Sequence, residues 1–185
     1  TLLLLGKLDA NLVDCAGGYG ILVRLLRDYG VNALWSDRHC KNLVARGFEH
    51  TTETAGLATA FEAFEHFEKP ADELDKLLGI APNVLFSTEI IADPAPKQED
   101  WWYYGKEHGQ HIGFFRIRTL EKLAQERGKS LLSNGVSYNL ITDQPINKAM
   151  WKLLIRANRL LPILLRRRLT PKTWSDYARI AGRDK

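Results

Sequence analysis

Residues 11–20 read NLVDCAGGYG, and this stretch decides the fold that we expect. It begins with a short apolar run, Asn11 to Cys15, and continues into a turn rich in glycine. Apolar residues at helical spacing follow directly: Ile21, Leu22, Leu25 and Leu26. The order of strand, tight turn and helix predicts the first unit of a parallel sheet, because parallel neighbours need crossover connections.

Strand and helix patterns alternate along the rest of the chain. Further strands are expected over residues 31–35, 48–52, 56–60, 82–87, 130–133 and 136–142, the last two as a hairpin around Asn134-Gly135. Helices are expected from Ile21 to Gly30, from Asp37 to about Arg46, from Pro70 to Gly79 and from Thr119 to Arg127. The alternation predicts an α/β fold, a doubly wound, mainly parallel, seven-stranded Rossmann-like sheet with helices on both faces. Ligands of such sheets bind beyond the carboxyl ends of the strands.

The charge of the chain divides between a body and a tail. Residues 145–185 contain 11 Lys and Arg against 2 Asp and Glu, a net charge of +9, whereas residues 1–144 contain 15 against 20, a net charge of −5. We therefore expect one domain over 1–144, followed by a basic tail over 145–185. An acidic body repels phosphate, so we expect no nucleic-acid partner. The two cysteines, Cys15 and Cys40, are too few for a disulfide framework, which suits the cytoplasm.

The glycine turn can be compared with the glycine patterns of three kinds of nucleotide-binding site. The Gly-Lys-Ser/Thr of phosphate-binding loops is absent. A dinucleotide fingerprint starting at Gly18 and Gly20 meets Val23 where close packing against a pyrophosphate requires Gly or Ala, which weakens a nicotinamide site. DCAGGYG, residues 14–20, resembles motif I of class I S-adenosylmethionine-dependent methyltransferases, Asp/Glu-x-Gly-x-Gly-x-Gly, with Ala16 in place of the first glycine.

The resemblance implies a donor site, and the chemistry of the turn agrees with it. Because Gly17, Gly18 and Gly20 lack side chains, the backbone can approach the amino-acid part of S-adenosylmethionine. Asp14 can join the hydrogen bonding around the donor's ammonium group, and Asp37, 23 residues later, lies near the offset at which an acidic residue receives ribose hydroxyls. The expected donor-binding residues are Asp14, Ala16, Gly17, Gly18, Tyr19, Gly20, Asp37, Ala60, Phe61 and Glu62.

Residues 60–67, AFEAFEHF, resemble the segment after the fourth strand in many methyltransferases of this class. In a helix, Glu62, Glu65 and His66 would share one face. A few families of the class combine this pattern with a later His to hold a metal, which implies a site of Glu62, Glu65, His66 and His111 for Mg²⁺, Mn²⁺, Fe²⁺ or Zn²⁺. Without a metal, Glu65, His66 and His111 are the candidate catalytic residues, with either His as general base. Structural roles for these side chains remain open.

Residues 89–113 form a long segment without periodicity, which is typical of a lid over a pocket. Four consecutive aromatic residues in it cannot all face one core, so we expect them to stack on a sugar or another planar acceptor. Filling of the core is the alternative. The expected acceptor-binding residues are Trp101, Trp102, Tyr103, Tyr104 and His108.

The order DCAGGYG, WSDRHCKN, AFEAFEHF, PNVLFSTEII, DWWYYGKEHGQHIGFF is similar to a bacterial methyltransferase family of type 23. Members look like enzymes of surface-polysaccharide or other glycan biosynthesis. The resemblance implies methyl transfer to an oxygen or carbon atom of a small-molecule or glycan acceptor. Two other functions remain open. One is a donor-binding module without catalysis that acts at a membrane surface or on a protein partner, and the other is a nicotinamide-dependent oxidoreductase.

The tail carries a basic amphipathic pattern from Ile146 to Leu165, which Pro162 interrupts. One interpretation is contact with an anionic membrane surface, which suits a lipid-linked glycan acceptor. The other is a helix that packs on its own domain or on a neighbouring subunit. We expect a cytoplasmic protein, peripheral to the inner membrane surface under the first interpretation.

Overall fold

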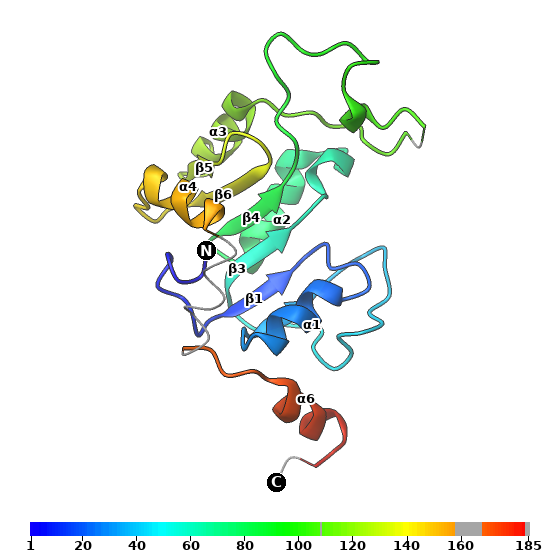
Figure 1. Ribbon diagram of the computed structural model, residues 1–185, viewed down its shortest axis with the longest axis vertical. Helices are drawn as coiled ribbons and strands as arrows, with labels where there is room; N and C mark the ends of the chain where they lie inside the picture. Colours follow the sequence, from blue (N-terminus) through cyan, green and yellow to red (C-terminus); the bar gives the residue numbers. More distant parts are fainter. Residues whose placement is uncertain (108, 158–167, 184–185) are drawn as a thin grey trace.

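The computed structural model describes residues 1–107, 109–157 and 168–183, and its centre is one six-stranded sheet (Figure 1). The sheet has the order β2-β1-β3-β4-β6-β5. Neighbours among β1 to β4 pair in parallel, whereas β6 is antiparallel to β4 and to β5. The predicted mainly parallel, Rossmann-like fold is therefore confirmed. The strands are β1 (Asn11–Asp14), β2 (Ala33–Trp35), β3 (Ala55–Ala60), β4 (Val84–Ser87), β5 (Ser130–Ser133) and β6 (Tyr138–Thr142).

The prediction of seven strands is wrong by one, because residues 48–52 do not form a ladder. Within the described ranges this segment meets the sheet only through an isolated bridge between Trp35 and Glu49. Directly afterwards the carboxylate of Glu53 accepts the backbone N–H groups of Thr51 and Thr52 at 2.8 and 3.1 Å. The side chain thus takes donors that a strand would need for pairing, and the chain turns away.

In the part of the chain that the structure describes, five α-helices and two short 3₁₀ helices connect or flank the strands. A predicted helix from Asp37 to Arg46 is absent from these residues. Side chains satisfy the backbone there locally, since Asp37 accepts the N–H groups of His39 and Cys40, and Asn42 accepts that of Ala45. The helices are α1 (Ile21–Asp28), η1 (Phe64–His66), α2 (Pro70–Ile80), η2 (Trp102–Tyr104), α3 (Ile117–Gln125), α4 (Lys148–Arg156) and α6 (Thr173–Ile180).

Helices cover both faces of the sheet, as a doubly wound fold requires. Successive strand residues alternate between two buried clusters, so that Leu57 and Leu140 pack on one side while Ala58 and Ile141 pack on the other. The first side is covered by α1 and α4, and the second by α2 and α3. Figure 1 shows α1 and α4 in front of the sheet and α2 behind it.

Residues after the hairpin pack on the body, and the contacts of α4 and α6 are the clearest examples. Trp151 of α4 is 1% exposed and belongs to the same buried cluster as Val23 and Leu132. The carboxylate of Asp176 in α6, a helix that the sequence did not lead us to expect, accepts two hydrogen bonds from the Arg27 guanidinium of α1 at 2.8 and 2.6 Å. The predicted amphipathic helix is seen only as α4, since residues 158–167 lie outside the described residues.

Bilayer-spanning length and apolar character do not occur together in any helix within the described ranges.

Candidate functional site

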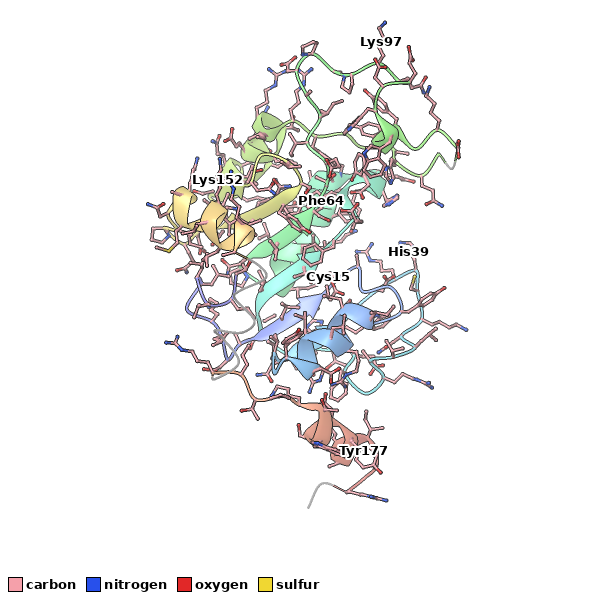
Figure 2. All side chains as sticks on the ribbon, viewed as in Figure 1. Cys15, His39, Phe64, Lys97, Lys152 and Tyr177 are labelled. Atoms are coloured by element: carbon pink, nitrogen blue, oxygen red, sulfur yellow. The ribbon has the colours of Figure 1, made fainter. Side chains whose placement is uncertain are left out.

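A cavity of about 450 Å³ lies at the carboxyl ends of the parallel strands. Its walls come from the segments that follow β1, β2 and β3 and from α2, which is where a sheet of this topology places a ligand. Figure 2 labels two of the residues that border it, Cys15 after β1 and His39 after β2. The lining residues are Cys15, Ala16, Gly18, Ser36, Asp37, Arg38, His39, Cys40, Ala60, Glu62, Ala63, His66, Phe67, Glu73, Lys76, Leu77 and Ile80.

The three glycines of the turn are needed for different reasons. A Cβ at Gly17 would lie 2.6 Å from Cδ1 of Trp35, and one at Gly20 would lie 2.8 Å from Oδ1 of Asn42. Gly18 has a φ of +51°, and a Cβ there would meet nothing within 4 Å. Gly17 and Gly20 therefore permit close packing of the turn, whereas Gly18 lines the cavity and leaves room for a ligand.

Asp37 is an ionised carboxylate on the wall of the cavity. Its Oδ1 accepts the N–H groups of His39 and Cys40 at 2.7 and 2.9 Å, and its Oδ2 accepts the N–H of Gly18 at 2.9 Å. Burial alone would raise the pKa of Asp37, but these backbone donors lower it overall. Because a carboxylate oxygen has two acceptor positions, Oδ2 retains one for a hydrogen-bond donor of a ligand.

Asp14 lies beneath the cavity and is not part of its lining. The side chain is 2% exposed and accepts a hydrogen bond from Oγ1 of Thr59 at 2.8 Å. Burial raises the pKa of Asp14 to about 6, with the Thr59 bond opposing and the charge of Asp37 adding to the shift. Asp14 therefore supports the turn from below. Burial, and then the charge of Asp14, also raises the pKa of Cys15 to about 12, so this thiol stays protonated.

The segment after β3 does not begin as a helix, so the predicted shared face of Glu62, Glu65 and His66 is wrong. Glu62 has a φ of +47°, which interrupts helical geometry. Its N–H donates to Oγ of Ser87 at 2.8 Å, and that hydroxyl donates back to Oε1 of Glu62. Glu62 thus lines the cavity, but its carboxylate is turned toward β4. Neighbouring Phe61 packs edge-on against Tyr138 outside the lining.

Glu65, His66 and His111 come together beside the cavity. One ligand atom from each lies within 4.8 Å of the others, and Glu62 does not belong to this group. His66 also lines the cavity, so the cluster and the cavity share a wall. The backbone holds the cluster closed, since the N–H groups of Ile112 and Gly113 both donate to the carbonyl oxygen of Glu65, at 2.8 and 2.9 Å.

The four consecutive aromatic residues separate into buried and exposed positions. Tyr103 is fully buried and packs 4.5 Å from the His111 ring, so it supports the cluster. Trp101 and Tyr104 pack around Phe114 at 5.7 and 5.0 Å. Trp102 is 76% exposed. The core-filling alternative thus holds for Tyr103, and His108 lies outside the described residues.

Tyr19 and Gly20 are also outside the lining, and part of the wall comes from residues that the sequence did not indicate. Arg38 follows β2 and donates to both carboxylate oxygens of Glu73 in α2 at 3.3 and 3.1 Å, while Lys76 pairs with Glu73 at 2.6 Å. These side chains connect two walls of the cavity. Arg38 directly follows Asp37, so its place next to the motif could have indicated it. The sequence pattern of α2 does not distinguish the helix face that lines the cavity from the face in solvent.

Comparison with known proteins gives one family. The model of the methyltransferase domain family of type 23 matches residues 1–134. No curated protein matches the chain.

Solved structures with a similar fold include methyltransferases. CalO1, a methyltransferase in calicheamicin biosynthesis in its SAH-bound form, is 15% identical, with a TM-score of 0.54 over 74% of this chain and 49% of that one. TnmH has the same identity and TM-score over 74% and 50%. Magnesium protoporphyrin IX methyltransferase from Synechocystis PCC 6803, with bound SAH, is 15% identical, with a TM-score of 0.51 over 76% and 78%. The chain spans about half the length of the first two, and at these identities the likeness shows the fold.

Proposed function

This chain belongs to the methyltransferase domain family whose model matches residues 1–134, and from that premise we propose that it transfers a methyl group from S-adenosylmethionine to a small-molecule or glycan acceptor. The observation that carries the proposal is the cavity at the strand ends. Gly18 and the ionised Asp37 line it together, and the N–H of Gly18 donates to Oδ2 of Asp37 at 2.9 Å. SAH in the structures of CalO1 and the Synechocystis enzyme supports the same donor class.

The residues present fit this donor. The backbone at Gly18 leaves space for the amino-acid part, and Asp37 offers an acceptor to the ribose hydroxyls. Apolar lining from Ala60, Phe67 and Leu77 suits the adenine ring. When bound, S-adenosylmethionine supplies a methyl group on a positively charged sulfur atom.

The acceptor binds on the side of Glu65, His66 and His111, below the segment that carries Trp101 and Trp102. His66 borders both the donor cavity and this cluster, so an acceptor hydroxyl beside it lies next to the transferred methyl group. The cluster activates that hydroxyl for attack on the methyl carbon. The exposed indole of Trp102 offers a stacking surface for a sugar ring.

A lipid-linked glycan is the acceptor that the exposed face of α4 favours. Met150 and Leu153 are 52% and 65% exposed on this helix, beside the exposed Lys148 and Lys152. Apolar and cationic side chains on one surface suit peripheral contact with the anionic cytoplasmic face of a membrane. Figure 2 labels Lys152 at the outer margin of the molecule, away from His39 of the donor cavity.

Calorimetry on the whole chain tests the donor site. We expect S-adenosylmethionine and its demethylated product to bind and nicotinamide dinucleotides not to bind. Gly18→Ala places a methyl group in the cavity at a positive φ, so we expect the donor Kd to rise about ten-fold or more.

Gly128→Ala is the matched control, because Gly128 has a φ of +65° and an equally open Cβ position outside the cavity. Both variants carry the same kind of backbone strain, and only the first should lose donor affinity. Tight nicotinamide binding without donor binding would overturn the proposal. Donor binding without methyl transfer to any glycan extract would favour the non-catalytic module.

A further inference from the structure

We propose that Glu65, His66 and His111 bind a divalent transition-metal cation beside the donor cavity. That this cation takes the acceptor hydroxyl as a further ligand rests on the function proposed above, whereas the binding of the cation itself does not.

The first observation is a buried carboxylate whose oxygens have no hydrogen bond of standard geometry to any described residue. Glu65 is 0% exposed, and neither Oε1 nor Oε2 has a hydrogen-bond partner among the described residues. The contact of His66 Nε2 with Oε1, at 4.0 Å, is too long for a hydrogen bond. A charged group in such a position is strongly unfavourable unless a cation or another donor compensates it. A metal ion bound to Glu65 provides that compensation.

The second observation is the orientation of the two imidazole rings. Nδ1 of His66 lies 2.8 Å from the carbonyl oxygen of Gln110, and Nδ1 of His111 lies 2.7 Å from that of Tyr103. A carbonyl oxygen only accepts, so Nδ1 is the donor in each contact, and Nε2 is the nitrogen that can bind a metal. Metal-binding histidines are typically held in this way, with the second nitrogen donating to a backbone carbonyl.

The distances fit a site that closes on a cation. The three ligand atoms lie within 4.8 Å of one another, whereas ligands about 2.1 Å from a metal are about 3.0–3.5 Å apart. Side-chain rotations that move the ligand atoms by roughly 1–2 Å would close that difference. The rings of His66 and His111 are already neighbours, with centroids 5.0 Å apart.

The charges around the site also favour a cation. Glu65 forms no ion pair with Lys or Arg within the described parts of the chain.

The ligand set indicates the kind of metal. One carboxylate and two imidazoles suit Mn²⁺, Fe²⁺ or Zn²⁺ better than Mg²⁺ or Ca²⁺, which prefer oxygen ligands. Three protein ligands leave coordination positions open for water or for an acceptor hydroxyl, whose pKa the cation would lower. Glu62 is not a ligand in this proposal, although the sequence pattern includes it, because its carboxylate accepts the hydrogen bond of Ser87.

Binding of Mn²⁺ to the chelator-treated whole chain tests the proposal without donor or acceptor. Electron paramagnetic resonance should report one bound Mn²⁺ per chain, and added Zn²⁺ should displace it. Glu65→Gln and His111→Gln keep the size of the side chains, and each should raise the Mn²⁺ Kd about ten-fold or more. Circular dichroism would confirm that both variants are folded.

Two control variants make the ligand set specific. His50→Ala removes an exposed imidazole that bonds the Glu53 carbonyl oxygen, and Glu62→Gln removes the carboxylate that the sequence pattern includes. Both should bind Mn²⁺ within about two-fold of the wild type. The proposal fails if the wild type binds no Mn²⁺, or if folded Glu65→Gln and His111→Gln bind it as well as the wild type does. Donor calorimetry in chelator separates this failure from failure of the donor site.

Discussion

Asp14 is the residue whose environment departs most clearly from what its motif predicts. The motif suggested a carboxylate near the donor's ammonium group, but the side chain is buried against Thr59 below the cavity. Native Asp14 releases its proton near pH 6, whereas an unfolded Asp has a pKa of 3.8. Between these values the native state binds more protons than the unfolded state, so the free energy of unfolding falls as pH rises. The loss of stability caused by ionising the buried Asp14 is complete above about pH 6 and absent below pH 3.8.

Replacing Asp14 with Asn removes this titration and keeps an acceptor for Thr59. We expect the stability of Asp14→Asn relative to the wild type to improve between pH 4 and pH 7 by up to about 3 kcal/mol, since one pK unit corresponds to about 1.4 kcal/mol. Urea unfolding of both proteins across that range provides the measurement. If the free energies of unfolding of the two proteins change with pH in the same way, the raised pKa of Asp14 is contradicted.

The residues of the glycine turn and its acidic partner were the easiest to predict. Gly18 and Asp37 stand out in the sequence because clustered glycines followed by an acidic residue at a fixed offset are typical of nucleotide-binding turns, and both residues line the cavity. The position of Glu62 was not predictable, because its positive φ depends on Ser87, which is far away in the sequence. The resemblance placed Glu65, His66 and His111 in one site, and the structure brings these three together. The backbone hydrogen bonds from residues 112 and 113 to Glu65 that hold them there are not visible in any local pattern.

At the scale of elements, segments with a clear apolar pattern were predicted well, and two segments rich in polar residues were not. The helix at Pro70 and the hairpin around Asn134-Gly135 are present as expected. Polar side chains that bond to nearby backbone replaced the helix after Asp37 and the strand at 48–52, because such bonds compete with helix and sheet. The helix α6 was missed because its stability depends on contacts with α1.

Those contacts predict a strong effect of Asp176. Its carboxylate is 3% exposed and pairs with Arg27 at 2.6 Å and with Arg24 at 2.9 Å, and the Arg27 guanidinium lies 3.7 Å from the centre of the Phe48 ring. Asp176→Ala leaves a buried guanidinium without its carboxylate, so we expect a loss of about 3 kcal/mol in the free energy of unfolding.

Asp143→Ala serves as the control, because Asp143 is exposed and pairs with a partly buried Lys129 at 3.3 Å. Such pairs contribute little, and we expect a loss below about 0.5 kcal/mol. Chemical denaturation of the two variants measures the difference. Equal losses would mean that α6 contributes no more to stability than a surface ion pair does.

The whole molecule raises the question of where the body ends. Charge alone suggested a division near residue 144, because the acidic and basic parts of the chain meet there. Packing does not follow that division, since α4 contributes a buried side chain to the same cluster as α1 and the hairpin. Net charge describes the surface of a protein and is a poor guide to which segments share its core.

Trp151 and Trp174 provide a matched pair for this question, with exposures of 1% and 81%. Trp151→Ala removes a core side chain next to β5 and β6, so we expect a loss of about 3–5 kcal/mol, toward the lower end because its indole N–H has no partner among the described residues. Trp174→Ala should change stability by less than about 0.5 kcal/mol. Denaturation followed by circular dichroism measures both. If the two variants unfold alike, α4 is an appendage, and the basic residues after the hairpin are then better placed to leave the body for a membrane surface.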